Sequence, residues 1–384
     1  MTADCAEQLS RHFGAGGEVH TVAAPGRVNL IGEHIDYHGL PVLPIALRRS
    51  VRVAFRPRTD GRIRAVSSER YGVREFEWTS GLLPTVAGDW ENYLRAAAEA
   101  VGRQWGVLHG VDAAIVSDLP PAAGLSSSSA LLVAFTLALL RANRISTSFE
   151  ELMEVLPEGE QFVGTRGGGM DHAASLASRA GCASLIGFVP LSVRPIPIPP
   201  EWAFLVAHSL HSAEKSGAVR AEYNSRRTAG TAALKNLNFT SYAEAIQGRT
   251  YSDLAAMTSD SAFLHVAGEA LRVRDAVAAL EQNDAGAFGR LLLESHASLR
   301  DRLKVSCPPL DRLVAAAMDS GALGARLTGG GFGGCAVVLC RRPDRPAVRD
   351  GLLARFYSGR PEFDPDQHLI DAEPGPGALS SSDW

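Results

Sequence analysis

The stretch PPAAGLSSSSALL, residues 120–132, places a glycine-containing loop directly before four serines and an apolar run. Residues 126–143, SSSSALLVAFTLALLRAN, are apolar on nearly every face and predict a buried helix. The amino terminus of a helix carries unpaired N–H groups and partial positive charge, so it can bind an anion such as phosphate without lysine. A serine-rich helix cap without any ligand explains the same stretch equally well.

Composition and charge restrict the classes of function. The chain of 384 residues is longer than one hydrophobic core usually organises, so we expect two domains. Hydrophobic residues make up 46% and charged residues 21%, which excludes a mainly disordered chain. The formal net charge of −4 provides no positive field for nucleic acid or an anionic membrane. Small-molecule chemistry is therefore the favoured class.

Cysteine usage and hydropathy predict a cytoplasmic protein. The 5 cysteines are too few and too scattered for a disulfide framework, and no CxxC pair suggests zinc or redox chemistry. The amino terminus lacks the apolar segment of a signal peptide, and no stretch reaches the roughly 18 apolar residues of a membrane span. The lysine-dependent phosphate loop GxxxxGKS/T is absent, so any nucleotide must be held in another way.

A polar cluster precedes the serine loop in the chain. The segment APGRVNLIGEHIDYHG, residues 24–39, lies between predicted strands at 19–30 and 51–55, and a further strand is predicted from Val111. The cluster consists of Arg27, Glu33, His34, Asp36 and Tyr37. Together these groups can bind the hydroxyls of a sugar, although each one taken singly is more often a solvated loop residue.

A second glycine-rich segment, GTRGGGMDH at residues 164–172, places Asp171 after three glycines that allow close approach to a ligand. A carboxylate there can accept a proton from a substrate hydroxyl, and a plain turn aspartate is the alternative. Before it, Ser148 and Glu151 predict a capping box that opens a helix. We expect Pro157 to interrupt that helix.

The proline-punctuated stretch VPLSVRPIPIPPEW, residues 189–202, predicts the boundary between domains 1–192 and 193–384. The second half is predicted to contain the strands AFLVAHSL and CAVVLC and three helical regions. These regions cover roughly 219–236, 263–304 and the segment from Pro309 to Gly321.

A third glycine run, TGGGFGG at residues 328–334, satisfies the pattern GxGxxG. A dinucleotide-binding turn follows a strand and opens a helix, whereas we expect a helix before this run and a strand after it. A structural turn or a loop that braces a phosphate site are the remaining interpretations.

Taken together and in this order, the segments resemble the galactokinase branch of the GHMP small-molecule kinases. GRVNLIGEHIDY is similar to the signature of that branch, PPAAGLSSSSA to the family's phosphate loop and ARLTGGGFGGC to its carboxy-terminal glycine loop. EYNSRR, ESHASLRD and VSCPPLDRLV extend the resemblance, which runs from about Ala24 to Ala378. It implies an α+β, two-domain GHMP kinase fold, with an N-terminal domain like ribosomal protein S5 domain 2, a ferredoxin-like C-terminal domain and the active site between them.

The resemblance also implies an activity, namely transfer of the γ-phosphoryl group of ATP, with Mg2+, to the anomeric hydroxyl of galactose. N-acetylgalactosamine or a related monosaccharide is an alternative substrate, because GEHIDYHG, TRGGGMD and SLIGFVPL look closer to the N-acetylgalactosamine kinases. A catalytically silent sugar and ATP sensor is the alternative from another class. Neither a nucleic acid nor an obligate protein partner is expected.

Residue by residue, the resemblance makes Asp171 the catalytic aspartate and Arg27 the arginine paired with it. The positions that match sugar-binding residues are Arg27, Glu33, His34, Asp36, Gly168, Asp171 and Tyr223. The triphosphate loop matches Gly124, Leu125, Ser126, Ser127 and Ser128, and Lys215 matches a basic residue near the transferred phosphoryl group. Ser128 and Glu160 match the magnesium ligands.

Three departures from the family pattern leave the identity of the sugar open, and a fourth concerns Glu160 as a magnesium ligand. His172 follows the aspartate where Gln is usual, and the glycine after DY is displaced to Gly39. Phe188 stands at a position that is often polar or acidic. The spacing from Glu160 to Gly164 is one residue shorter than in many relatives, and one residue rotates a helical side chain by about 100°.

Overall fold

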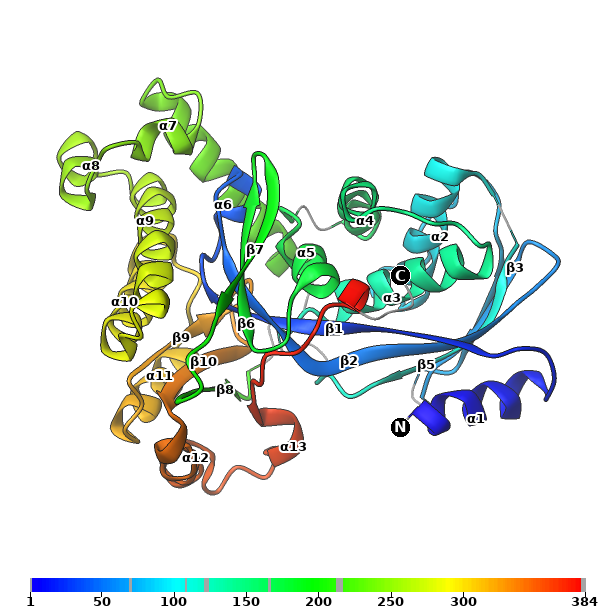
Figure 1. Ribbon diagram of the computed structural model, residues 1–384. Helices are drawn as coiled ribbons and strands as arrows, with labels where there is room; N and C mark the ends of the chain where they lie inside the picture. The colour runs from blue at the N-terminus through cyan, green and yellow to red at the C-terminus, as the bar shows by residue number, and fades with distance from the viewer. Residues whose placement is uncertain are drawn as a thin grey trace.

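Two lobes, each built on its own β-sheet, make up the molecule (Figure 1). We analysed a computed structural model, which describes residues 2–68, 71–107, 109–120, 124–164, 167–211 and 217–380. The sheet of the first lobe has the strand order β1-β2-β5-β3-β4, and all neighbours are antiparallel except β3 and β5. Its strands are β1 (His20–Ile31), β2 (Leu43–Pro57), β3 (Arg62–Val66), β4 (Val73–Glu77) and β5 (Val111–Ser117).

Helices cover both faces of this first sheet. The helices of the lobe are α1 (Thr2–Phe13), α2 (Glu91–Trp105), α3 (Ser127–Ala142), α4 (Phe149–Phe162) and α5 (Met170–Ala177). Side chains alternate along β2, so Val53 and Phe55 belong to the core beneath α2 and α3, whereas Ala54 packs against Leu9 of α1. Helix α3 lies between the sheet and the other helices, which explains why it is apolar on nearly every side.

The expected break at Pro157 does not occur. The capping box of Ser148 and Glu151 opens α4 as predicted, but α4 continues through Pro157 as one helix. A Cβ atom at Gly159 would lie 3.2 Å from the side chain of Leu132, so this glycine lets α4 pack closely on α3. This packing outweighs the one backbone hydrogen bond that proline removes.

The second lobe contains a four-stranded sheet in the order β11-β8-β10-β9. Its strands are β8 (Trp202–His208), β9 (Gly324–Thr328), β10 (Cys335–Arg341) and β11 (Leu369–Asp371). Helices separate β8 from β9 and β10 from β11, so the topology is βαββαβ with the spatial order 4-1-3-2 of a ferredoxin-like domain. The predicted fold class is thereby confirmed.

Ten helical segments of four or more residues occur in the described part of the second lobe. They are α6 (Gly217–Asn236), α7 (Tyr242–Ile246), α8 (Tyr251–Met257), α9 (Ser261–Glu281), α10 (Ala285–Ser298), the π-helical turn Leu299–Leu303, α11 (Pro308–Asp319), α12 (Arg345–Leu352), the π-helical turn Leu353–Tyr357 and α13 (Pro365–His368). The helical region expected over 263–304 is therefore divided. Asn283 takes a left-handed φ of 55°, and Asp284 caps α10 by accepting a hydrogen bond from the backbone of Ala287.

The glycine run 328–334 joins two strands. The expectation that a helix precedes it was wrong, because β9 lies between α11 and the glycines. Since β9 and β10 are antiparallel neighbours, the run is a hairpin loop followed by a strand, and it does not open a helix. The dinucleotide-binding interpretation is excluded for this reason.

The two lobes are joined twice by the chain. A hairpin of β6 (Cys182–Phe188) and β7 (Leu191–Pro197) precedes β8, and the boundary predicted between residues 192 and 193 falls inside β7 and stays a prediction. After β11 the chain returns to the first lobe, where Gly375 N–H donates to Ala46 O and Gly377 N–H donates to Ser178 O. The return ends in a 3-10 turn, Ala378–Ser380, next to α5 (Figure 1).

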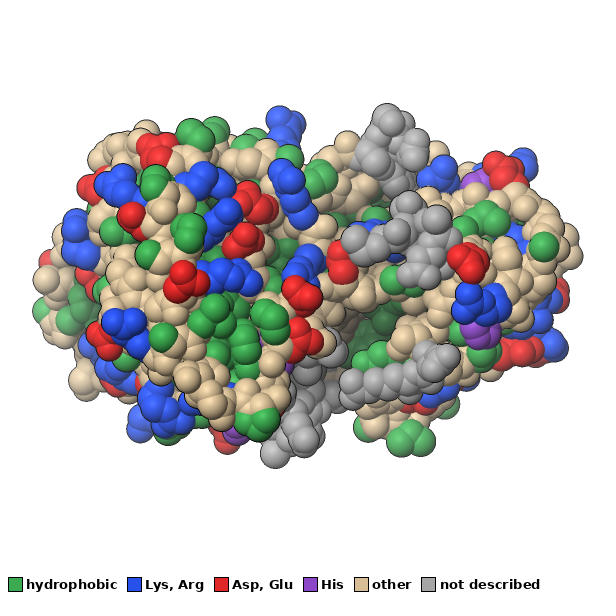
Figure 2. Space-filling view, turned by 90° about the horizontal axis from the view of Figure 1, so that it is seen from below, with side chains coloured by type: hydrophobic (Ala, Val, Ile, Leu, Met, Phe, Trp, Pro, Cys, Tyr) green, Lys and Arg blue, Asp and Glu red, His purple; other side chains and the backbone are tan. Residues whose placement is uncertain are grey.

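Two surface properties agree with the composition. Among the described residues, no helix combines the length and the apolar character needed to cross a membrane. On the face shown in Figure 2, acidic and basic side chains alternate over both lobes. This face therefore presents no broad patch of one sign.

Candidate active site

One cavity receives all three of the loops singled out in the sequence. Its lining includes residues 124 and 126–129 of the serine loop, 167–172 of the glycine-rich segment and 328–334 of the β9–β10 hairpin. Arg27, Glu33, His34 and Asp36 from the end of β1 and the following loop line it too, and so does Tyr223 of α6. Residues from both lobes thus meet at one site, as the resemblance implied.

Arg27 and Asp171 form a partly buried ion pair in the lining of the cavity. Nε and Nη2 of Arg27 lie 2.7 Å and 2.6 Å from Asp171 Oδ1, and Nη1 donates to Gly124 O at 2.8 Å. Burial raises the pKa of Asp171, but the positive charge of Arg27 and the hydroxyl of Ser126 outweigh it, so this pKa lies below its ordinary value. Asp171 is therefore ionised at neutral pH.

A bulge in β1 turns Arg27 toward the site. The pairing of β1 with β2 shifts register between Pro25 and Arg27, and the intervening Gly26 has no room for a side chain, because a Cβ would lie 2.7 Å from Leu125 O. Arg27 N–H donates to the same carbonyl at 3.1 Å. Leu125 thus braces Arg27 through its backbone and is not among the cavity-lining residues.

The serines at the head of α3 do not act as an ordinary helix cap. Ser126 is the N-cap residue but has a left-handed φ of 57° and no capping hydrogen bond from its side chain. Its hydroxyl instead donates to Asp171 Oδ2 at 2.5 Å. Ser127 and Ser128 line the cavity beside it. The simple capping interpretation is wrong for Ser126, whose hydroxyl serves the site.

Glu160 lies close to the serine loop through Ser129. The hydroxyl of Ser129 donates to Glu160 Oε1 at 2.5 Å and lies 3.4 Å from Asp171 Oδ2. His172 is 1% exposed, with Nε2 at 3.7 Å from Glu160 Oε1 and without a hydrogen-bond partner for either ring nitrogen among the described residues. Ser129 therefore joins the residues expected near a metal, and the buried His172 lies beside Glu160.

Asp36 is held against the glycine-rich segment. Gly168 N–H donates to Asp36 Oδ2 at 3.1 Å, and a Cβ at Gly168 would lie 2.4 Å from the backbone of Asp36, so only glycine fits. Burial, reinforced by the negative charge of Asp171, raises the pKa of Asp36 to about 6. Asp36 and Asp171 thus occupy one site with opposite pKa shifts.

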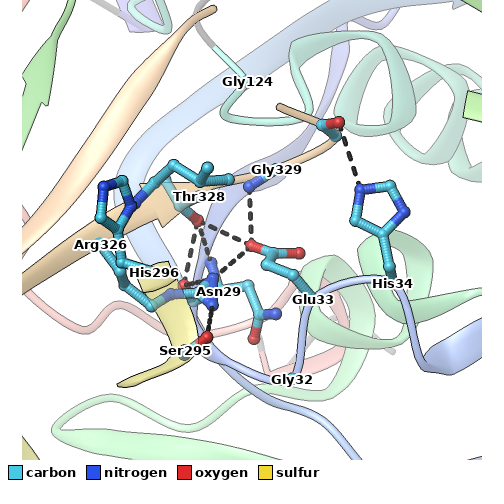
Figure 3. Close-up of polar contacts among 12 residues, drawn as sticks. Asn29, Gly32, Glu33, His34, Gly124, Ser295, His296, Arg326, Thr328 and Gly329 are labelled. Carbon is cyan, nitrogen blue, oxygen red and sulfur yellow. Dashed lines mark hydrogen bonds and ion pairs between the residues drawn. The ribbon is translucent and has the colours of Figure 1, made fainter. Parts of the chain in front are cut away.

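Glu33 bridges the two lobes with one of its oxygens. Oε1 accepts hydrogen bonds from Arg326 Nη2 at 2.6 Å, from Gly329 N–H at 2.7 Å and from Thr328 Oγ1 at 3.2 Å. In Figure 3, the other carboxylate oxygen points away from Arg326, toward the side on which His34 lies. Glu33 lines the cavity as predicted and is also a structural partner of the second lobe.

His34 is fixed at both ring nitrogens. Nε2 lies 3.2 Å from Gly330 O and Nδ1 lies 2.8 Å from the hydroxyl of Tyr37. Because a carbonyl only accepts, Nε2–H is the donor and Nδ1 accepts from Tyr37. Burial lowers the pKa of His34 to about 4, so the ring is neutral. The ring of Tyr223 packs 5.2 Å from it, centroid to centroid, at the edge of the cavity.

One predicted position is not described, one departure from the family pattern lies away from the cavity, and Arg326 was missed in addition to Ser129. Lys215 lies outside the described residues. Phe188 ends β6 and is not among the residues that line the cavity. Arg326, fully buried, was overlooked, although an arginine inside the otherwise apolar segment GARLT is an available signal.

Comparison with known proteins identifies relatives along most of the chain. Three family models match: the galactokinase galactose-binding signature at residues 7–57, the GHMP kinases N terminal domain at 92–179 and the GHMP kinases C terminal domain at 276–358. A galactokinase from Roseiflexus sp. (strain RS-1) is 38% identical over 366 residues, covering 93% of this chain and 92% of the relative. Human galactokinase is 36% identical over 379 residues, covering 94% of each.

Solved structures agree with these matches. The crystal structure of Lactococcus lactis galactokinase complexed with galactose superposes with a TM-score of 0.88 at 26% identity, covering 98% of both chains. A mevalonate kinase from Methanococcus jannaschii matches with a TM-score of 0.65 at 17% identity, covering 93% of this chain and 98% of the other. The second likeness concerns the fold alone.

Proposed function

The chain belongs to the galactokinase family of the GHMP kinases, and from this premise we propose that it transfers the γ-phosphoryl group of ATP to the anomeric hydroxyl of galactose. The products are galactose 1-phosphate and ADP. The shared name of the relatives and the galactose in the L. lactis structure support galactose as the substrate. The few, scattered cysteines, which predict no disulfide framework, support the cytoplasm as the proposed place of action.

The observation that carries this proposal is the position of Asp171. Its carboxylate lies in the cavity between the serine loop and the polar cluster that follows β1, so one side chain faces both prospective substrates. A sugar hydroxyl is a poor nucleophile at neutral pH, and a carboxylate that accepts its proton as the new bond forms accelerates transfer by ~10²–10⁴. Asp171 is the residue assigned to that role.

Arg27 gives Asp171 its charge state and its orientation. Two nitrogens of Arg27 contact Asp171 Oδ1. The other oxygen, Oδ2, therefore points toward the serine loop, where it accepts a hydrogen bond from Ser126. A lowered pKa makes Asp171 a weak base, which is compatible with phosphoryl transfer, because its loose transition state depends chiefly on alignment and on neutralised charge. Arg27 can also face the oxygens of the transferred group.

The residues at the head of α3 fit a magnesium nucleotide. Serine hydroxyls and a carboxylate are the hard oxygen donors that Mg2+ prefers, and Ser128, Ser129 and Glu160 supply them along one wall of the cavity. Among the described residues, no group of three or more His, Cys, Asp or Glu side chains could hold a metal alone, as expected for a cation that shares its ligands with phosphates and water. When bound, Mg2+ neutralises charge on the triphosphate.

Hydrogen-bonding groups at the other end of the cavity fit a monosaccharide. Asp36, which is held by the N–H of Gly168, and the second oxygen of Glu33 offer acceptors within one buried region. Buried polar groups of this kind reject a substrate that lacks the matching hydroxyl, because they are then left unpaired. Tyr223 closes this end from α6.

A coupled assay of ADP release with Mg-ATP and a panel of sugars tests the proposal. We expect galactose to give the highest kcat/KM, N-acetylgalactosamine a lower one and glucose little turnover. A higher kcat/KM for N-acetylgalactosamine would reassign the substrate. No ADP release with any sugar, despite sugar and ATP binding, would instead identify a silent sensor.

A further inference from the structure

The carboxylate of Glu33 receives its orientation from the second lobe. All three donors to Oε1 come from β9 or the glycine loop that follows it, and Arg326 provides the shortest contact, 2.6 Å. Glu33 is 2% exposed and Arg326 is 0% exposed, so water does not compete for this pair. With Oε1 fully occupied, Oε2 remains as the oxygen that can face a ligand.

Arg326 is itself fixed by a ring of polar groups. Nη2 donates to Asn29 O at 3.3 Å and Nη1 donates to Ser295 Oγ at 3.3 Å (Figure 3). Nη1 also lies 3.7 Å from Glu269 Oε1. The planar guanidinium therefore contacts β1, α10 and α9 at the same time as Glu33. An ammonium group keeps the charge but cannot reproduce this fixed fork of donors.

Glu269 extends the network to Gly32, the first residue after β1. Its Oε1 accepts hydrogen bonds from Gly32 N–H at 3.0 Å and from Ser295 Oγ at 2.7 Å, and its Oε2 accepts from Arg272 Nε at 2.8 Å. Gly32 directly precedes Glu33. The carboxylates of Glu33 and Glu269 are thus balanced in charge by the guanidiniums of Arg326 and Arg272. Of these two arginines, only Arg326 contacts both carboxylates.

We propose that Arg326 is a positioning residue for sugar binding, which holds the carboxylate of Glu33 so that its free oxygen accepts one hydroxyl of the monosaccharide. This inference rests on the proposed function. If Arg326 has this role, the affinity for the sugar depends on the contact between β9 and the end of β1, whereas the affinity for the nucleotide does not.

The test compares Arg326→Lys with a matched control, Arg272→Lys. Arg272 belongs to the same buried network and pairs with Glu269, but among the described residues it forms no ion pair with Glu33, and it does not line the cavity. Sugar binding is measured by calorimetry without ATP, and KM is measured for both substrates. We expect Arg326→Lys to raise the galactose Kd and KM about tenfold, the effect of one charge-assisted hydrogen bond, and to leave the KM for ATP within about twofold. Arg272→Lys should leave the galactose Kd within about twofold of wild type.

Deoxygalactose analogues separate positioning from general loosening of the fold. If Arg326 acts through one oxygen of Glu33, the analogue that lacks the matching hydroxyl binds wild type and Arg326→Lys equally well, while the other analogues bind the variant more weakly. An equal loss for every analogue, an unchanged galactose Kd in Arg326→Lys, or an equal rise in Arg272→Lys would each overturn the inference.

A second variant covers the case in which Arg326→Lys does not fold. Thr328→Val removes a hydroxyl that lies 3.2 Å from Glu33 Oε1 and 3.0 Å from Asn29 O, and it preserves the shape of the side chain. Because the single proton of this hydroxyl is shared between the two acceptors, a smaller rise in the galactose Kd is expected, with the same dependence on a single hydroxyl of the sugar. An unchanged Kd in a folded Thr328→Val would count against the inference. Wild type that binds galactose but releases no ADP would overturn only the proposed activity, because the binding measurements need no turnover.

Discussion

Arg27 places two nitrogens on one oxygen of Asp171, at 2.6 and 2.7 Å, while the hydroxyl of Ser126 occupies the other oxygen. Asp171→Asn removes the charge and the proton acceptor but keeps the size of the side chain. We expect kcat to fall by about 10²–10⁴, with the affinity for ATP nearly unchanged. Single-turnover rates and equilibrium nucleotide binding check this.

The same substitution leaves Arg27 buried without its counter-ion, so a lower melting temperature should accompany the loss of activity. Wild-type turnover in a correctly folded Asp171→Asn would remove Asp171 from the mechanism.

Asp36 should set the acid limb of the pH profile. In the sugar-free enzyme its pKa is about 6, so the carboxylate is progressively protonated as pH falls from 7 to 5 and loses acceptors for sugar hydroxyls. Asp171 does not titrate in this range, because its pKa is lowered, and neither does His34, whose pKa is about 4. We therefore expect kcat/KM for galactose to decline below a pH of about 6.

Asp36→Asn is the control for this limb. The variant should show a lower kcat/KM that no longer changes between pH 5 and 7. Retention of the acid limb at the same pH in Asp36→Asn would assign it to another group.

Gly168→Ala should weaken sugar binding through the backbone. The new methyl group would lie 2.4 Å from the main chain of Asp36 and 2.7 Å from its Cγ, so Asp36 must move. We expect the KM for galactose to rise about tenfold or more, since small displacements in a binding site are costly. Gly286→Ala in α10, where the methyl group has its nearest neighbour at 3.4 Å, is the matched control and should match wild type in steady-state kinetics.

Glu160→Gln should weaken the response to Mg2+. The amide carbonyl can still accept from Ser129, but the negative charge is lost, so we expect the Mg2+ concentration for half-maximal rate to rise about tenfold. Binding of Mn2+ to the nucleotide complex, followed by electron paramagnetic resonance, should weaken in parallel. Glu158→Gln, on the same helix but 59% exposed and paired with Arg103, should behave as wild type.

Sequence patterns were sufficient where local periodicity or a motif decides the structure. The apolar run after Ser129, the capping box at Ser148 and the strand that begins near Trp202 all formed as predicted. Pro157 departed from local preference, because packing of α4 on α3 decided that place, and local propensity does not register such packing. The split at Asn283 and Asp284, in contrast, follows local signals, a left-handed Asn and an Asp cap, which helical periodicity alone does not include.

The site was predictable as a set of segments but not as a set of contacts. Glu33 could be placed in a sugar-binding cluster, whereas its ion pair with Arg326, 293 positions further along the chain, has no local signature. Ser126 likewise reads as a helix cap in the sequence, and only the approach of Asp171 shows where its hydroxyl is used. Long-range partners follow from topology and not from spacing.

The return of the carboxy-terminal segment to the first lobe has a consequence for biosynthesis. Gly375 and Gly377 bond to Ala46 and Ser178, which are made long before them. On a translating ribosome these bonds are missing until Gly375 and Gly377 have emerged from the exit tunnel, long after the strands of the first lobe. The carbonyls of Ala46 and Ser178 therefore wait for these partners while the whole second lobe is being synthesised.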